Sequence, residues 1–157
     1  MSDIKLAVIG GGSSYTPELI SGIIDRIELL PIREIVLVDI PEGEEKLSII
    51  HALSERMMKK RGINCKITKT FDRKSALNGA SFVINQFRVG GLKARELDES
   101  IPLELGIIGQ ETTGPGGFAK ACRTIPVALN IAGEMESYCP NAWLINFTNP
   151  AGMITQA

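Results

Sequence analysis

The sequence predicts an α/β fold with a doubly wound parallel sheet. Short, continuous apolar runs such as Leu6–Ile9 have the composition of buried parallel strands. Segments with apolar residues at helical spacing separate these runs, and a glycine-rich turn follows the first of them. Strands that alternate with helices in this way form parallel sheets with right-handed crossovers. The chain has 157 residues, 44% of them apolar and 22% charged, which suits one ordinary domain spanning residues 1–157.

The first half of the chain predicts two strand–helix pairs. A helix with Pro17 near its first turn should follow Leu6–Ile9, and the strand EIVLV (34–38) ends at Asp39. The next helix begins among acidic residues, ends among basic ones and stops at Gly62, as the helix dipole and glycine C-caps favour. Apolar residues recur at helical spacing in the two helices: Leu19, Ile20, Ile23, Ile24 and Ile27 in the first, and Leu47, Ile50, Leu53 and Met57 in the second.

The second half continues the alternation. Its expected strands are Cys65–Thr70 at an edge, Ser81–Phe87 at the sheet centre, and Ala142–Phe147. Its expected helices are Arg73–Leu77, Leu92–Ser100 and Ala119–Tyr138, with the glycine-rich loop GQETTGPGG (109–117) before the last of them, and Asn149-Pro150 opens one more. Because the chain stops soon after that point, we expect a nucleotide-binding part that is truncated before a C-terminal catalytic and substrate-binding region.

Charge and cysteine content exclude several classes of partner. The net charge is −1 without a basic block, so the sequence gives no electrostatic case for nucleic acid or for an anionic membrane. No apolar run approaches the length of a bilayer span. Cys65, Cys122 and Cys139 form no C-x-x-C pair, and His51 is the only histidine, so we expect no metal site within this chain. A reducing, cytoplasmic setting follows from the unpaired cysteines.

The turn after the first strand resembles a dinucleotide fingerprint with one irregularity. Gly10, Gly11 and Gly12 let a backbone approach a pyrophosphate at the N-terminus of a helix, and Ser13 and Ser14 add hydroxyl donors. The third glycine of G-x-G-x-x-G is replaced by Tyr15, which must either push the helix outward or turn its ring aside. The alternative is a merely flexible turn.

Polar residues that follow two other strands support a Rossmann-like, NAD-binding fold. Asp39 stands where a carboxylate accepts both ribose hydroxyls, and it would repel the 2′-phosphate of NADP, although it could instead cap a helix. Asn85, Gln86 and Arg88 lie at the end of the expected central strand and should line the nicotinamide side of the crevice. We therefore expect NAD as the cofactor.

Three segments together resemble glycoside hydrolase family 4, the NAD- and metal-dependent glycosidases. They are GGGSSYTPEL (10–19), QFRVGGLKARELDESIPLELGIIGQETTGPGG (86–117) and AWLINFTNPAG (142–152). Within that family the chain is most similar to the members that hydrolyse 6-phospho-β-glucosides. The resemblance implies a phosphorylated disaccharide or aryl glucoside as substrate, and a homo-oligomer at full length.

The resemblance also implies a redox route without paired catalytic carboxylates. NAD takes hydride from C3 of the sugar, a divalent metal such as Mn²⁺ polarises the oxygen there, and a tyrosine removes the C2 proton. The aglycone then leaves by elimination, water adds, and the hydride returns. This order is chemically consistent, because a C3 ketone acidifies the C2–H bond and a metal stabilises the enolate.

Three residues of this chain match functional positions of the family. Arg95 and Asn149 match substrate-binding residues, and Glu111 matches a glutamate that raises the basicity of the catalytic tyrosine. Each also has a plain structural interpretation. Arg95 could pair with Glu99 at i,i+4 on a helix surface, Asn149 could be an N-cap before Pro150, and Glu111 could be a solvated loop acid.

Other parts of the family's site have no match here. Its metal-binding cysteine and histidine and its catalytic tyrosine would lie beyond Ala157, so we expect this chain to be inactive alone. The residues that do not match them are Cys122, Cys139, His51, Tyr15 and Tyr138.

Two other functions remain open from the sequence. A lactate/malate-type 2-hydroxy-acid dehydrogenase would share the sheet and use arginines such as Arg88 and Arg95, but it offers no role for GQETTGPGG. A non-catalytic NAD-binding sensor module is the second. Net accumulation of NADH would identify the dehydrogenase, and a metal-ligand set in further sequence would exclude the sensor.

Overall fold

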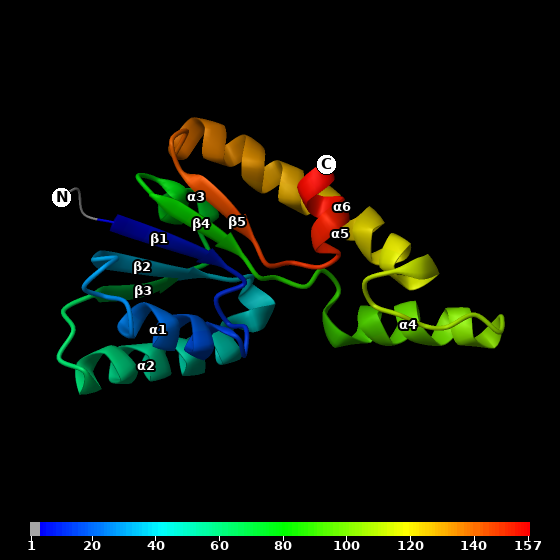
Figure 1. The fold of residues 1–157 in the computed structure, drawn as a ribbon, viewed down its shortest axis with the longest axis horizontal. Helices are drawn as coiled ribbons and strands as arrows, with labels where there is room; N and C mark the ends of the chain where they lie inside the picture. The colour runs from blue at the N-terminus through cyan, green and yellow to red at the C-terminus, as the bar shows by residue number, and fades with distance from the viewer. Residues whose placement is uncertain (1–3) are drawn as a thin grey trace. The chain divides into compact units, whose positions relative to one another are not determined.

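The computed structural model describes residues 4–157, and Met1–Asp3 lie outside the described residues. The chain forms two compact units (Figure 1). The first takes in the chain up to Gln86 together with Glu134–Ile145, and the second consists of Phe87–Gly133 and Asn146–Ala157.

The first unit is built on a five-stranded parallel sheet, which confirms the predicted fold class. Its strands are β1 (Ile4–Ile9), β2 (Ile32–Val38), β3 (Lys66–Thr70), β4 (Phe82–Asn85) and β5 (Trp143–Asn146), in the order β3-β2-β1-β4-β5. The order reverses between β1 and β4, which is where ligands bind in doubly wound sheets. Ile9 lies level with Val38 on one side and with Asn85 on the other, so three strands end together at this edge.

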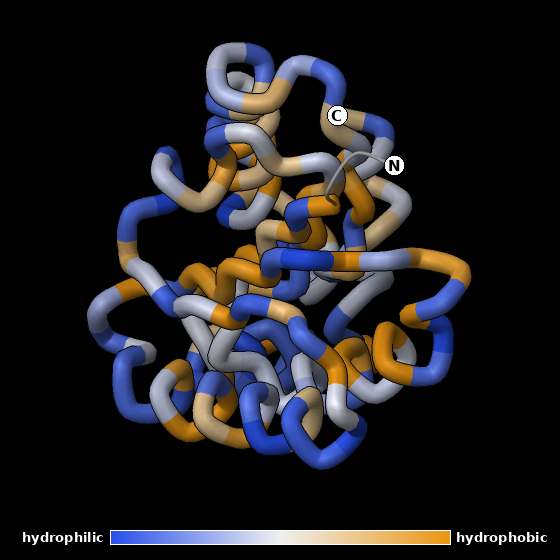
Figure 2. The backbone as a smooth tube through the Cα atoms, turned by 90° about the vertical axis from the view of Figure 1, so that its left-hand side faces the viewer, coloured by the Kyte–Doolittle hydropathy of each residue, from blue (hydrophilic) through white to orange (hydrophobic). Residues whose placement is uncertain are grey.

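Helices cover both faces of the sheet. Helices α1 (Thr16–Ile24) and α2 (Glu44–Lys60) lie on one face, and α3 (Arg73–Leu77) lies on the other with the last turns of α5 (Figure 1). A short 3₁₀ helix, η1 (Pro41–Gly43), precedes α2. Hydrophobic and hydrophilic segments alternate along the chain (Figure 2). The buried core beneath α1 and α2 comprises Leu6, Val8, Ile20, Ile23, Ile32, Ile35, Leu37, Leu47, Met58 and Ile67.

The buried face of α2 differs from the predicted stripe. Leu47 is fully buried as expected, but Leu53 and Met57 are only half-buried, and Ser54 and Met58 take the inward positions. Ser54 can be buried because its hydroxyl donates to the carbonyl of Ile50 at 2.8 Å. Hydrophobicity alone therefore placed the stripe about one residue off.

The second unit contains α4 (Gly91–Glu104), most of α5 (Gly114–Tyr138) and α6 (Ala151–Gln156). The predicted loop 109–117 is wrong in its second half, because α5 already begins at Gly114. Pro115 suits the first turn of a helix, where a missing N–H costs nothing. Gly117 serves close packing rather than flexibility, since a Cβ there would lie 2.5 Å from the carbonyl carbon of Thr112.

The start of α6 also differs from the expectation. Its N-cap is Pro150 and no side chain caps it, so the interpretation of Asn149 as an N-cap is wrong. The Asn149–Pro150 peptide is cis. Among residues 4–157, no helix is both long enough and apolar enough to cross a membrane.

Candidate functional site

The glycine loop, residues 10–15, is hydrogen-bonded to the end of β2. The N–H groups of Gly10 and Gly11 both donate to the carbonyl of Val38, at 2.9 and 2.8 Å. Gly10 has φ +87°, a conformation that side chains rarely adopt, and a Cβ on Gly11 would lie 2.7 Å from the Cβ of Leu37. These glycines are therefore required by the turn and by its contact with the sheet.

The missing third glycine is accommodated by turning Tyr15 outward. Its side chain is half exposed, which is the second of the two predicted outcomes. The next residue, Thr16, is fully buried and donates from its hydroxyl to the carbonyl of Gly11 at 2.8 Å. Thr16 and Pro17 form the first turn of α1, so the helix begins directly on the loop without a third glycine.

Gln86 braces the same loop from the end of β4. Its Nε2 donates to Thr16 Oγ1 at 2.6 Å and to the carbonyl of Gly10 at 3.2 Å. Its main-chain N–H donates to the carbonyl of Ile9 at 2.9 Å. The sequence did not indicate this bracing role, because nothing in it shows that a residue 70 positions after Thr16 returns to that side chain. The cofactor role of Gln86 stays a prediction.

Asp39 joins the glycine loop to the following segment. One carboxylate oxygen accepts from the N–H of Gly12 and the other from the N–H of Ile40, both at 2.9 Å. The interpretation as a helix cap is wrong, because no side chain caps η1 or α2. Each carboxylate oxygen has a second lone pair, so the group retains the capacity to accept ribose hydroxyls.

This edge of the sheet suits a dinucleotide in a further respect. Asn85, at the end of β4, is completely buried, yet neither atom of its amide has a hydrogen-bond partner among the described residues. A buried amide without partners costs free energy, so a donor or acceptor supplied by a ligand would stabilise it. Ser13 is half-buried and Ser14 is exposed beside it, where a pyrophosphate would meet the first turn of α1.

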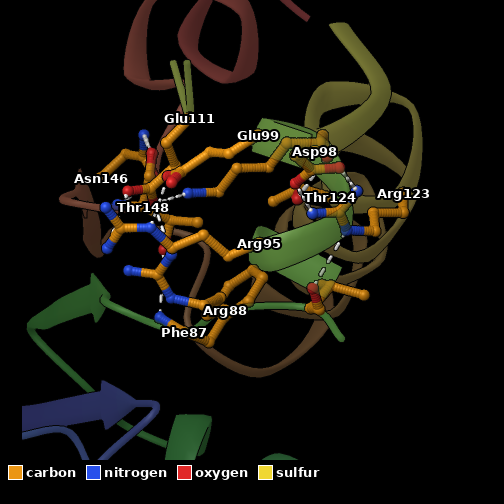
Figure 3. Close-up of polar contacts among 12 residues, drawn as sticks. Phe87, Arg88, Arg95, Asp98, Glu99, Glu111, Arg123, Thr124, Asn146 and Thr148 are labelled. Atoms are coloured by element: carbon orange, nitrogen blue, oxygen red, sulfur yellow. Dashed lines mark hydrogen bonds and ion pairs between the residues drawn. The ribbon is translucent and has the colours of Figure 1, made fainter. Parts of the chain in front are cut away.

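The second unit contains a compact group of charged side chains, here named the Glu111 cluster: Arg88, Arg95, Glu99, Glu111 and Lys120 (Figure 3). Glu111 Oε1 receives Arg88 Nη1 at 2.5 Å and the Nζ of Lys120. Glu111 Oε2 lies 3.4 Å from Arg95 Nη1. Arg95 also donates from Nε to Glu99 at 2.7 Å, so its predicted i,i+4 pair is present.

These cations keep the Glu111 carboxyl ionised. Burial by itself raises the pKa of Glu111, but the hydrogen bond from Lys120 and the charges of Lys120, Arg88 and Arg95 outweigh it, so the pKa lies below its usual value. Its side chain is only 16% exposed, and the interpretation as a solvated loop acid is therefore wrong. Lys120 is 3% exposed and was not singled out in the sequence, although a lysine between Ala119 and Ala121 is a visible signal.

A second ion pair fixes the helix that carries Arg95. Arg123 of α5 binds both carboxylate oxygens of the buried Asp98 of α4, with Nη1 at 2.8 Å from Oδ1 and Nη2 in contact with Oδ2. Its Nε donates to the carbonyl of Val89 at 3.1 Å. Figure 3 shows this pair beside the Glu111 cluster. The arrangement holds α4 to α5 with Arg95 directed toward Glu111.

The remaining predicted residues of this unit, Arg88 and Asn149, lie near the starts of its two chain segments, Phe87–Gly133 and Asn146–Ala157. Arg88 follows β4 and contacts Glu111, and its predicted role toward NAD stays a prediction. Asn149 is exposed and follows Thr148, whose buried hydroxyl accepts from the N–H of Phe87 at 3.1 Å. This hydrogen bond places Asn149, the residue after Thr148, near Arg88, the residue after Phe87.

The part of the chain that the structure describes contains no group of three or more histidine, cysteine or carboxylate side chains that could hold a metal ion. His51 lies on α2, and its Nε2 is 3.1 Å from the carbonyl oxygen of Ile67. The three cysteines are free thiols.

Comparison with known proteins adds a family. The model of family 4 of the glycosyl hydrolases matches residues 5–157. A probable 6-phospho-β-glucosidase of Bacillus subtilis (strain 168) is 61% identical over 154 residues, covering 98% of this chain and 35% of the relative. A 6-phospho-β-glucosidase of Escherichia coli (strain K12) is 56% identical over 154 residues, covering 98% and 34%.

A solved structure agrees in fold. The 6-phospho-β-glucosidase of Thermotoga maritima, determined with manganese, NAD⁺ and glucose 6-phosphate, superposes with a TM-score of 0.90 at 46% identity. The match covers 98% of this chain and 37% of that one. The chain thus spans about a third of the length of the relatives that it matches.

Proposed function

The chain belongs to family 4 of the glycosyl hydrolases, and on that premise we propose that it is the NAD-binding part of an enzyme that hydrolyses 6-phospho-β-glucosides. The observation that carries the proposal is the 61% identity over 154 residues to a relative named for that activity. The glycine loop and Asp39 support it, because they stand at the end of the sheet where such a cofactor binds. The family match does not favour a 2-hydroxy-acid dehydrogenase.

The first unit would hold the cofactor. NAD supplies a hydride acceptor that lets the sugar be oxidised transiently at C3, and a divalent metal such as Mn²⁺ polarises the oxygen there. Gly10, Gly11 and Gly12 would admit the pyrophosphate to the N-terminus of α1, with hydroxyl donors from Ser13 and Ser14. Asp39 would accept the ribose hydroxyls. The other proposed contacts are made by Tyr15, Asn85 and Gln86.

The second unit would hold the sugar. Arg95 is a donor with a fixed planar geometry suited to an oxyanion or hydroxyl, and Asn149 offers both a donor and an acceptor. Glu111 would sit beside the base that removes the C2 proton, raising its basicity through a negative charge. Arg95 and Asn149 are the residues that we propose to bind the substrate. Arg88 is proposed instead to contact the cofactor, like Tyr15, Asn85 and Gln86.

The metal ligands and the base would come from outside these 157 residues. None of this chain's cysteines, histidine or tyrosines is proposed for those roles, so the chain alone should be inactive. We further propose a homo-oligomer in the cytoplasm that acts on phosphorylated disaccharides or aryl glucosides, without a nucleic-acid or membrane partner. A net charge of −1 and free thiols support that setting.

One assay separates the proposed function from its rivals. The full-length protein is incubated with 4-nitrophenyl 6-phospho-β-glucoside, with NAD and Mn²⁺ each added or omitted. Release of nitrophenol that needs both additions, without accumulation of NADH, supports the proposal. Accumulation of NADH with a 2-hydroxy acid would indicate the dehydrogenase, and NAD binding without any turnover would indicate a sensor module.

A further inference from the structure

Lys120 is the most deeply buried cation of the Glu111 cluster. It lies on α5 with 3% of its side chain exposed, and among residues 4–157 its one acidic contact is Glu111. A buried ammonium is costly unless it is paired, and apolar side chains of similar volume often stabilise such positions as well or better. Stability alone is therefore a weak reason for a lysine here.

The geometry divides the two oxygens of Glu111 between different partners. Oε1 is occupied by Lys120 from α5 and by Arg88 from the segment after β4. Oε2 faces Arg95 of α4 at 3.4 Å, which is beyond ordinary hydrogen-bond length. Oε1 is thus occupied by two cations, while Oε2 retains the capacity to accept a further proton donor.

We propose that Lys120 is a positioning residue, which anchors Oε1 of Glu111 so that Oε2 is presented to the group that abstracts the substrate proton. This inference rests on the proposed function for the role of that group. The anchoring of Glu111 by Lys120 does not depend on the proposed function, because it involves this chain alone. The charges facing Glu111 come from three segments: Lys120 from α5, Arg95 from α4 with its partner Glu99, and Arg88 from the turn between β4 and α4.

The first test is made on Glu111 itself in the full-length protein, without substrate or cofactor. Its carboxyl carbon is followed by ¹³C NMR against pH, with Glu111→Gln used for assignment. We expect the pKa of Glu111 to lie below its ordinary value in the wild type and to rise in Lys120→Met. Lys120→Arg keeps the charge, so it should keep the pKa low. An ordinary pKa in the wild type overturns the proposal even if Lys120→Met does not fold.

The second test is kinetic. In Lys120→Met we expect kcat to fall about tenfold or more with KM changed less, because a misplaced carboxylate affects proton abstraction rather than binding. The acid limb of kcat/KM should move to higher pH, since removing a cation raises the pKa of both Glu111 and a neighbouring base. Lys120→Arg should restore the position of the limb. The exposed Lys60, at the end of α2, provides the control Lys60→Met, which should change neither kcat nor the acid limb of kcat/KM.

The outcomes separate the two proposals. If Lys120→Met lowers only the melting temperature while the kcat and pH profile of the folded enzyme stay unchanged, Lys120 is merely structural and the inference is wrong. If the wild type hydrolyses no 6-phospho-β-glucoside, the proposed function fails. The NMR titration then still decides whether Lys120 anchors Glu111.

Discussion

The carboxylate of Asp39, at the end of β2, accepts a hydrogen bond from the N–H of Gly12 at 2.9 Å. A Cβ on Gly12 would lie 2.8 Å from the same oxygen, so only glycine allows this approach. Asp39, which we propose to bind the ribose, therefore also positions the glycine loop, which we propose to bind the pyrophosphate. We therefore expect Asp39 to link cofactor choice to loop geometry.

Asp39→Ser should therefore weaken NAD binding and remove the preference over NADP. The wild type is expected to bind NAD at least about tenfold more tightly, because a second anion beside the carboxylate is repelled. Calorimetry with both cofactors measures the ratio, and Asp25→Asn, which alters an exposed carboxylate at the end of α1, is the matched control. Equal or tighter binding of NADP by the wild type would remove Asp39 from the ribose.

The contact of Gly11 with β2 gives a stability prediction. In Gly11→Ala the new Cβ would lie 2.7 Å from Leu37 Cβ and 2.9 Å from Leu37 Cα, neither of which can move freely. We expect a loss of roughly 1–3 kcal/mol in the free energy of unfolding, as for other overpacked sites. Urea denaturation measures it.

Gly22→Ala is the matched control for that substitution. Gly22 lies inside α1 with nothing within 4 Å of the added Cβ. Since alanine favours helix over glycine, this variant should gain about 0.5–1 kcal/mol. An unchanged stability of Gly11→Ala beside a stabilised Gly22→Ala would mean that the loop is not pressed against β2.

The order of strands and helices was predictable because it depends on local patterns. Apolar runs, Gly62 and the acidic start of α2 act over one or two turns, and each predicted strand and helix is present. Helix boundaries were less predictable near glycines, because glycine occurs both in loops and at close backbone contacts within helices. The predicted loop includes Gly114–Gly117, yet these residues form the first turn of α5, where Gly117 lies at a close backbone contact.

The site was predictable in its residue types but not in its contacts. Asp39 and the glycines follow their strands directly, so their meeting at one edge of a parallel sheet follows from topology. Lys120 and Gln86 act on residues that lie 9 and 76 positions away, on Glu111 and Gly10. Such contacts depend on how α5 and β4 pack, which no local pattern of the sequence encodes.

The pair between Arg73 of α3 and Glu134 of α5 predicts a pH dependence of stability. Arg73 donates to both carboxylate oxygens, at 2.5 and 2.7 Å, and this hydrogen bonding lowers the pKa of Glu134 despite partial burial. A carboxyl with a lowered pKa stabilises the fold above its unfolded pKa of about 4.5, and this stabilisation is lost as the pH falls through the folded value.

Glu134→Gln should therefore cost roughly 1–3 kcal/mol at pH 7, with the difference from the wild type shrinking below about pH 4.5. Urea denaturation at several pH values gives the comparison. Glu28→Gln removes an exposed carboxylate from the first unit and is expected to have no such effect. A difference that stays constant down to pH 3 would contradict the assignment to the ionised pair.

Arg95→Ala tests the proposed substrate side in the full-length enzyme. Arg95 contacts Glu111 and Glu99 and belongs to the second unit, whereas the glycine loop belongs to the first. We expect kcat/KM for a 6-phospho-β-glucoside to fall by about a hundredfold, with the dissociation constant of NAD within about twofold of the wild type. Lys93→Ala, at an exposed position of α4, is the control. An unchanged kcat/KM would leave Arg95 as a helix-surface partner of Glu99.

Glu111→Gln should move the pH profile in the direction opposite to Lys120→Met. The pKa of Glu111 is lowered, so the carboxyl is ionised throughout the working pH range and the substitution removes a full negative charge. A tyrosine base has an ordinary pKa of about 10, which neighbouring cations lower and a neighbouring carboxylate raises. In Glu111→Gln the ammonium and guanidinium groups of Lys120, Arg88 and Arg95 lose their shared counter-charge, which lowers the pKa of the base further.

The acid limb of kcat/KM in Glu111→Gln should therefore lie at lower pH, with a reduced plateau, because a base of lower pKa abstracts a proton less well. NAD affinity should be largely preserved, since among the described residues Glu111 contacts neither the glycine loop nor Asp39, although it does contact Arg88. Profiles of wild type, Glu111→Gln and Lys120→Met, recorded beside NAD titrations, give the comparison. A limb that stays in place while NAD binding collapses would assign Glu111 to the cofactor instead. Limbs that move the same way in both variants would contradict the charge argument, because the two substitutions remove opposite charges from one ion pair.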